Sequence, residues 1–524
     1  MVQQKTYPLR TRSRRRRRAP RAVFWTLAVL VLAAATVISA GVAWVAKSGT
    51  SAAAATAPKT REPAVPTSVL AGSPAVISDT AATTMLASAP SVVVTSLTSR
   101  SAASAAASIA LRAHAPLLLM PPGAGQQLTA LRSAIRLLHS TAVLASGVPA
   151  SALAADLPGV RVVSSAAALP RLTAATPVRN VAVLVHRTSS PEGANLAAAA
   201  ATTAAVAGAR VIAMPGYNPQ TVPAAIRLLA AAKPTRVIAV GARFGSTRAV
   251  GVRVAVAETG VQLPGGGQVL FPMRRIVALY GNPLYPALGV LGHQDLPASI
   301  VRARAVAAQY NRLSKVPVIP AFEIIATVAS AYPGQNGDYS YEMSLASLRP
   351  WVNAATKAHM YVTLDLQPGR ANFLAEAKHY QSLLERPNVG LALDPEWKLG
   401  PDQFPLKQIG SVSISEVNSV VTWLARLTAQ HHLPQKLLEL HEFRLSMIQD
   451  IQQLDRRHSD LAIVINMDGQ GAPSTKQQTW DAVIANAPKG VFFGWKDFYV
   501  KDTPMLDPRQ TIEHTPEPVL ISYQ

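Results

Sequence analysis

The chain has 524 residues, with 50 Lys and Arg against 28 Asp and Glu, and it contains no cysteine. This length allows two or three domains, and a hydrophobic content of 49% excludes a mostly disordered chain. Without cysteine the protein has no disulfide, no zinc–thiolate or iron–sulfur site and no thiol nucleophile. The net charge of +22 is carried by residues 1–270, because residues 271–524 contain equal numbers of basic and acidic side chains.

The N-terminal region combines a basic cluster with a long apolar stretch. Residues 1–21 carry nine basic side chains and no acid, and residues 22–46 carry no charge. A helix of this length spans a bilayer, and the basic flank holds its own end in the cytoplasm. The sequence therefore predicts a single-pass cell-membrane protein with a signal-anchor at 22–46 and extracellular C-terminal domains. A cleaved signal peptide, giving a secreted protein, is the alternative. Beside this apolar stretch the Arg run indicates a membrane partner and not nucleic acid.

Residues 47–75 are mostly small, with several Ser, Thr and Pro, and predict a flexible linker. The next region, 76–262, repeats itself, since AIRLL occurs at 134–138 and again at 225–229. Strands and helices alternate in each copy, which is the pattern of a parallel α/β sheet. The predicted strands are 92–95, 117–120 and 142–145 in the first copy and 181–185, 211–214 and 236–240 in the second.

These units resemble the cell-wall-binding repeats of Gram-positive surface proteins, in which an apolar-apolar-Gly sequence ends the third strand. Gly147 and Gly241 hold that position here. The family's Asp-Ala-Leu is missing, replaced by residues 101–107 in the first copy, and two units are visible where the family usually has three. The resemblance implies wall binding, and the 15 basic against four acidic residues of 66–270 suit an anionic wall polymer such as teichoic acid, or peptidoglycan. An unrelated α/β spacer is the alternative.

Eight apolar runs separated by helix-like segments predict a (β/α)8 TIM-type barrel over 271–524. The whole chain is thus expected to be α/β: a transmembrane helix, two repeats and the barrel. The runs are 274–281, 317–323, 360–367, 389–397, 436–443, 461–469, 490–499 and 518–524, and the helix-like segments are 298–313, 345–358, 371–384, 414–430, 444–455 and 477–486. The barrel segment also resembles an uncharacterised family of exported actinobacterial proteins through YGNPLYPALGVLG, FEIIATVAS, LDLQPGR, LDPEW, FRLSMI, DGQG and FFGWKDFY. That resemblance implies no particular activity.

The C-terminal ends of the predicted strands carry acidic and aromatic residues, and a TIM barrel has its chemistry at those ends. Paired carboxylates cleave glycosidic bonds and aromatic rings contact sugars, so this composition is typical of a glycan site. We expect catalysis from Glu323, Asp365, Asp394 and Glu396, and substrate binding from Tyr280, Trp397, Glu442, Asp468, Trp495 and Tyr499.

Asp394-Pro395-Glu396 is the most specific motif of this set. Strand alternation places both carboxylates on the face that lines the barrel interior, and their pKa values are expected to separate so that Glu396 becomes a general acid supported by Asp394. The motif resembles the Asp-x-Glu of muramidase-type glycoside hydrolases and chitinase-like barrels, although the two acids that precede it in the full chitinase motif are missing. The structural alternatives are an ion pair with Lys398 or a cap on the next helix.

Other chemistries have weaker signals. His441 and Glu442 lack the spacing of a zinc helix, and the glycine runs lack a following Lys-Ser/Thr, so neither a metal nor another cofactor is expected. Asp497, beside Lys496, is expected to be solvated or ion-paired, and a further catalytic carboxylate is the alternative. Two functions remain open: a membrane-anchored hydrolase of wall glycan, and a non-catalytic carbohydrate-binding or structural surface protein.

Overall fold

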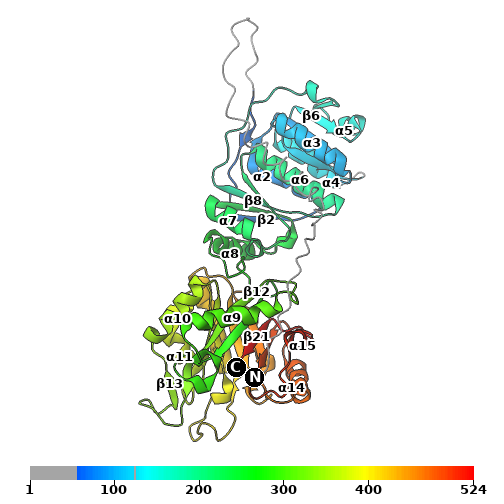
Figure 1. Cartoon of the computed structure of the whole chain (residues 1–524). Coiled ribbons are helices and arrows are strands. Elements are labelled where there is room, and N and C mark those ends of the chain that lie inside the picture. The colour runs from blue at the N-terminus through cyan, green and yellow to red at the C-terminus, as the bar shows by residue number, and fades with distance from the viewer. Residues whose placement is uncertain (1–55, 123–125) are drawn as a thin grey trace, which may run out of the picture. The chain divides into compact units, whose positions relative to one another are not determined.

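The computed structural model describes residues 56–122 and 126–524 (Figure 1). Within these ranges no helix is both long and apolar enough to cross a membrane. The predicted basic tail at 1–21 and the predicted anchor at 22–46 lie outside the described residues, so both stay predictions.

The first repeat forms a four-stranded parallel sheet with the strand order β5-β4-β6-β7. Its three predicted strands are confirmed, and a fourth, β7, follows them. The elements are β4 (Ser91–Ser96), α3 (Arg100–Arg112), β5 (Leu117–Met120), α4 (Gln126–Leu137), β6 (Ala142–Ser146), α5 (Ala150–Asp156) and β7 (Arg161–Val163).

The second repeat has the equivalent strand order β9-β8-β10-β2, but its fourth strand comes from the opposite end of the domain. β2 (Thr67–Leu70) pairs in parallel with β10, and the helix α2 (Pro74–Met85) follows it. The predicted linker is therefore wrong for this part of 47–75, and the domain begins before residue 76. The other elements are β8 (Val181–His186), α6 (Pro191–Val206), β9 (Arg210–Met214), α7 (Pro223–Ala232), β10 (Arg236–Val240) and α8 (Thr247–Glu258).

The repeated sequence motifs have equivalent roles in the two sheets. In both AIRLL copies the first, second and fifth residues are buried, while Arg136 and Arg227 are exposed. Gly147 and Gly241 follow the third strand with φ values of 71° and 113°. A side chain at Gly147 would also place its Cβ 2.4 Å from that of Ala102, so the turn requires glycine there.

The C-terminal region is a closed barrel of eight parallel strands, which confirms the TIM-type prediction. All eight predicted runs contribute one strand each, and β11 closes the ring by pairing with both β12 and β21. The strands are β11 (Arg275–Gly281), β12 (Val318–Ala329), β14 (Tyr361–Leu366), β15 (Val389–Leu393), β17 (Lys436–His441), β19 (Leu461–Met467), β20 (Phe492–Asp497) and β21 (Leu520–Tyr523). A short strand, β13 (Ser340–Glu342), adds antiparallel to β12.

Helices connect most of these strands and cover the outside of the ring (Figure 1). They are α9 (Leu296–Tyr310), α10 (Leu345–Lys357), α11 (Phe373–His379), α12 (Gln381–Leu384), α13 (Ile414–Gln430), α14 (Pro473–Asn486) and α15 (Pro508–Ile512). The helix expected at 444–455 is wrong: this stretch holds the two-residue strand β18 (Ile448–Gln449) and a short 3₁₀ turn.

The strand alternation divides the barrel residues into an outer and an inner set. Side chains such as Leu364, Leu391 and Ile465 belong to the core beneath the helices. The inner set is apolar in its N-terminal half, where Ile276, Ala321 and other residues pack together. In the C-terminal half the inner set becomes polar, and this change of character defines the candidate site.

Candidate active site

The polar half of the barrel interior is almost closed to solvent. Its residues are all buried: Tyr280, Glu323, Thr363, Asp365, Asp394, Glu439, His441, Asn466, Asp468, Lys496 and Ser522. They come from all eight strands or their immediate C-terminal ends. Predicted site residues from separate strands thus lie together, as the barrel topology requires.

His441 is the centre of this group. Its Nε2 atom lies 3.1 Å from Oε1 of Glu323, and 3.7 Å from both Oδ1 of Asp365 and Oε1 of Glu439. Its Nδ1 atom lies 3.0 Å from Oδ2 of Asp468, within hydrogen-bonding distance. One imidazole therefore contacts four carboxylates from three other strands and its own.

Two of these carboxylates each accept a hydrogen bond from a neutral side chain. The Tyr280 hydroxyl donates to Oδ2 of Asp365 at 2.9 Å, and Nδ2 of Asn466 donates to Oε1 of Glu439 at 2.6 Å. The ammonium of Lys496 lies 3.3 Å from the centre of the Tyr280 ring, a cation–π contact. The other oxygens of Asp365 and Glu439 have no hydrogen-bonding partner.

Burial and mutual repulsion disturb the protonation of the acids. Burial, reinforced by the charge of Asp365, raises the pKa of Asp394 well above its usual value. Burial and the charge of Glu323 do the same for the pKa of Glu439. Burial alone would raise the pKa of Asp468. The positive charge of His441 and its hydrogen bond have the larger combined effect, so the pKa of Asp468 lies below its usual value. The direction of this shift favours the ionised form of Asp468.

Asp394 and Glu396 do not share a strand face as predicted. β15 ends at Leu393, and residues 395–397 form a 3₁₀ turn whose first amide, that of Glu396, donates to Oδ1 of Asp394 at 3.2 Å. Proline at 395 has no amide hydrogen for the ladder, which explains why the strand stops. Asp394 thus caps this turn. The alternative pairing with Lys398 is not formed, because that ammonium lies 3.5 Å from Oε1 of Glu416.

Glu396 nevertheless has the properties expected of a general acid. Its side chain is partly exposed, whereas those of Asp365, Asp394 and Asp468 are buried. Burial, then the charge of Asp468, raises its pKa to about 7. The sequence predicted the raised pKa and attributed it to burial together with the charge of Asp394. The structure corrects this: Asp468, from another strand, exerts the larger charge effect.

Two of the four aromatic residues predicted to bind substrate, Tyr280 and Trp495, are buried. Trp495 is fully buried on the outer side of the barrel, with its ring 5.6 Å from that of Trp480. Tyr280 is buried within the acid cluster. Tyr499 is exposed, but it contacts Arg302 and Tyr523 and not the cluster. Trp397, which follows Glu396 and is partly exposed, is the one predicted aromatic that stays a candidate for sugar contact.

Two further acids have surroundings that the sequence did not predict. Both oxygens of Glu442 are buried without a hydrogen-bonding partner, and burial together with the charge of Asp468 raises its pKa to about 8. Asp497 is fully buried on the outer side, where it accepts from Nε1 of Trp495 at 2.7 Å and from the Thr511 hydroxyl at 3.2 Å. The expectation of a solvated Asp497 is wrong.

Glu439 and Asn466 belong to the cluster although the sequence did not single them out, and Lys496, which was considered only as a neighbour of Asp497, belongs to it as well. Each lies within a run that is mostly apolar or aromatic. The signal was present in the alternation, since Leu437, Glu439 and His441 share one face of β17. A polar residue on the inner face of a barrel strand, in its C-terminal half, is for this reason a candidate site residue.

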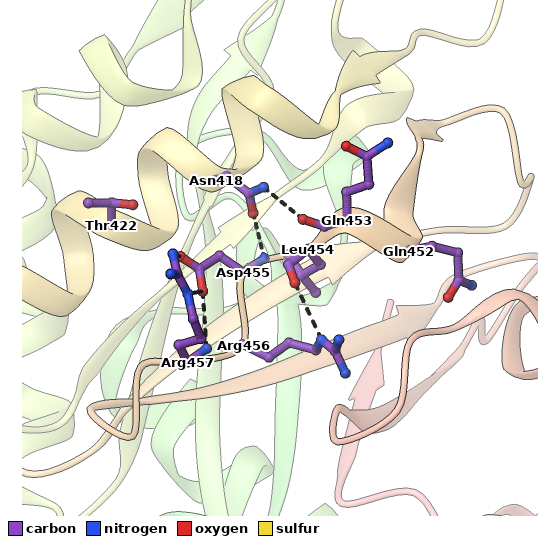
Figure 2. Close-up of a pocket in the computed structure, with 8 residues that line it drawn as sticks. All are labelled: Asn418, Thr422, Gln452, Gln453, Leu454, Asp455, Arg456 and Arg457. Atoms are coloured by element: carbon purple, nitrogen blue, oxygen red, sulfur yellow. Dashed lines mark hydrogen bonds and ion pairs between the residues drawn. The ribbon is translucent and has the colours of Figure 1, made fainter.

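A separate pocket lies on the outside of the barrel, between α13 and the segment after β18 (Figure 2). Its polar groups satisfy one another: Nδ2 of Asn418 donates to the Gln453 carbonyl at 3.0 Å, and Arg457 pairs with Asp455 at 2.7 Å. None of the predicted catalytic or binding residues lines this pocket.

Comparison of the chain with protein-family models, with curated proteins and with solved structures finds no match. The candidate site is therefore interpreted from its own chemistry.

Proposed function

We propose that the barrel hydrolyses glycosidic bonds of cell-wall glycan, with Glu396 as the general acid. The observation that carries the proposal is the position of Glu396, a partly exposed carboxyl group at the C-terminal end of a barrel strand beside a cluster of buried acids. Burial and the charge of Asp468 raise its pKa to about 7, which suits this role. A general acid works best when its pKa lies near the working pH, because it is then both protonated and able to release its proton.

The second carboxylate of the mechanism is Asp468. Its contact with His441 favours its ionised form, and its charge acts on Glu396. Two carboxyl groups whose environments separate their pKa values are the common machinery of glycosidases. Glu396 donates a proton to the leaving oxygen as a water molecule attacks the sugar carbon and passes its own proton to solvent, while the negative charge of the buried Asp468 stabilises the positive charge that develops on the sugar. Glu323, Asp365 and Asp394 lie deeper, so their role is to support this pair.

The rest of the chain supports a place at the cell wall. The basic and apolar N-terminal residues are those of a membrane anchor with an extracellular C-terminal part. Most arginines of the repeat domain are exposed, and among its described residues a single ion pair, between Arg132 and Asp156, neutralises one of them. Exposed cationic side chains of this kind would bind anionic wall polymer or peptidoglycan.

A non-catalytic surface or carbohydrate-binding protein is the second candidate. The observation that favours it is burial: Glu323, Glu439 and His441 are fully buried and cannot contact a polymer. In this case the cluster stabilises the barrel, and binding occurs elsewhere.

The deciding experiment measures reducing ends released from purified wall glycan by the full-length chain, between pH 4 and pH 9. We expect release by the wild type and a loss of roughly 10²–10⁴-fold in Glu396→Gln, which has no proton to donate. Glu513→Gln, a change of an exposed acid on the same barrel, serves as the matched control and should retain full activity. If the folded wild type binds glycan but releases nothing at any pH, the surface-protein candidate replaces the enzyme.

A further inference from the structure

The geometry around His441 points to a site for one divalent transition-metal ion, held by Glu323, Glu439 and His441 inside the barrel. One oxygen from each carboxylate and a ring nitrogen of the histidine lie within 4.8 Å of one another. Metal–ligand bonds of about 2.1 Å place ligands on opposite sides of an ion about 4.2 Å apart, so small side-chain movements would complete the site. This inference does not depend on the proposed function.

Several atoms of the cluster that a metal ion would bind make no hydrogen bond to other side chains. Both oxygens of Glu323 and one oxygen of Glu439 are buried and make no hydrogen bond, and Nε2 of His441 lies 3.1 Å from Oε1 of Glu323 without hydrogen-bond geometry. Native proteins rarely leave buried polar atoms unsatisfied, and a bound ion is one way in which such atoms gain a partner. A single cation would serve all four atoms at once.

Neighbouring side chains hold His441 and Glu439 in place. Asp468 contacts Nδ1 of His441, and Asn466 donates to Oε1 of Glu439. A carboxylate that accepts a hydrogen bond from the far nitrogen of a metal-binding histidine is a recurring outer-shell arrangement, because it orients the ring and selects the tautomer whose free nitrogen faces the ion. Tyr280 holds Asp365 in the same way, and Oδ1 of Asp365, 3.7 Å from Nε2, is available as a fourth ligand.

The donor set indicates the class of ion. Two or three carboxylate oxygens with one imidazole suit Zn²⁺, Mn²⁺ or Fe²⁺, whereas Mg²⁺ and Ca²⁺ prefer oxygen ligands alone. The three ligands are fully buried, so the ion would not contact a polymeric substrate. Its effect would be structural: it would compensate the negative charges and set the position of Asp468 through His441.

The test uses the untagged full-length chain, stripped with a chelator and then dialysed against Zn²⁺ or Mn²⁺, with Mg²⁺ as comparison. We expect about one equivalent of Zn²⁺ or Mn²⁺ per chain by elemental analysis, and a rise in melting temperature on the order of 5 °C. His441→Gln and Glu439→Gln should lose both effects. Glu376→Gln, an equally buried carboxylate that instead bonds to Thr327 and Ser340, is the matched control and should keep them.

X-ray absorption of the zinc-loaded wild type keeps the test decisive if the variants fail to fold. The expected first shell has one imidazole nitrogen with oxygens at about 2.0–2.2 Å. A shell with two or more imidazoles would show a different site and overturn the assignment. So would a stripped wild type that takes up no metal, or one that binds Mg²⁺ as well as Zn²⁺.

Discussion

Nδ1 of His441 lies 3.0 Å from Oδ2 of Asp468, and through this contact one imidazole joins the buried carboxylates of Glu323, Asp365 and Glu439 to that of Asp468. The relationship makes the ionisation of Asp468 depend on residues that solvent does not reach. Because the charge of Asp468 in turn raises the pKa of Glu396, the buried group influences the exposed one.

The first prediction concerns the pH dependence of hydrolysis. Asp468→Asn removes a charge that favours the protonated form of Glu396, so the pKa of Glu396 falls. The alkaline limb of the profile of kcat/KM against pH, near pH 7 in the wild type, should move to lower pH. In Asp394→Asn the limb should move less, because the charge of Asp468 remains. Equal shifts in the two variants would contradict the assignment of Asp468 as the controlling charge.

The second prediction concerns stability. Burial raises the pKa of Glu376 to about 8 in the folded protein, against an ordinary 4.5 in the unfolded chain. Between these values the folded state holds a proton that the unfolded state has lost, so the free energy of unfolding falls as pH rises from about 5 to 8. Glu376→Gln keeps the hydrogen bonds in reach and cannot ionise. Its melting temperature should decline less between pH 5 and pH 8 than that of the wild type; parallel declines would exclude this residue as a cause.

The third prediction distinguishes Trp495 from Trp397, both of which the sequence assigned to substrate binding. Trp495→Ala leaves a large cavity beside Trp480 and should destabilise the fold by about 3–5 kcal/mol, measured by denaturant unfolding. Trp397→Ala removes a partly exposed ring and should change stability much less while raising KM for glycan. A Trp397→Ala enzyme with an unchanged KM would remove this residue from the binding site.

The fourth prediction concerns wall binding. The full-length chain should sediment with purified walls, and rising salt should release it as the charges are screened. Arg136→Ala with Arg227→Ala, the exposed arginines of the two AIRLL copies, should lower the salt concentration needed for release. Arg349→Ala, on the exposed surface of α10, is the control and should bind as the wild type does. Wall binding that does not depend on salt concentration, and that persists after the anionic polymer is removed, would contradict the electrostatic mechanism.

The sequence predicted the barrel well because each strand is a short apolar run with a clear start and end. It failed where the decisive interaction is distant in the chain. The strand β2 looks like a linker by composition and is ordered only by pairing with β10. Likewise, the pKa of Glu396 depends on Asp468, 72 residues away in the chain, and no local pattern relates the two. The end of β15 at Leu393, in contrast, was foreseeable from Pro395.

The pairing of β2 with β10 also determines when during synthesis β2 can join its sheet. Thr67 lies opposite Val237, so β2 is synthesised about 170 residues before its partner. At typical rates of translation this delay is roughly 10–30 s. Over that interval the strand has no sheet to join, and its backbone groups are open to other partners. A factor that retains nascent segments would have this interval in which to bind residues 67–70, and the four-stranded sheet of the second repeat is complete only after β10 has emerged.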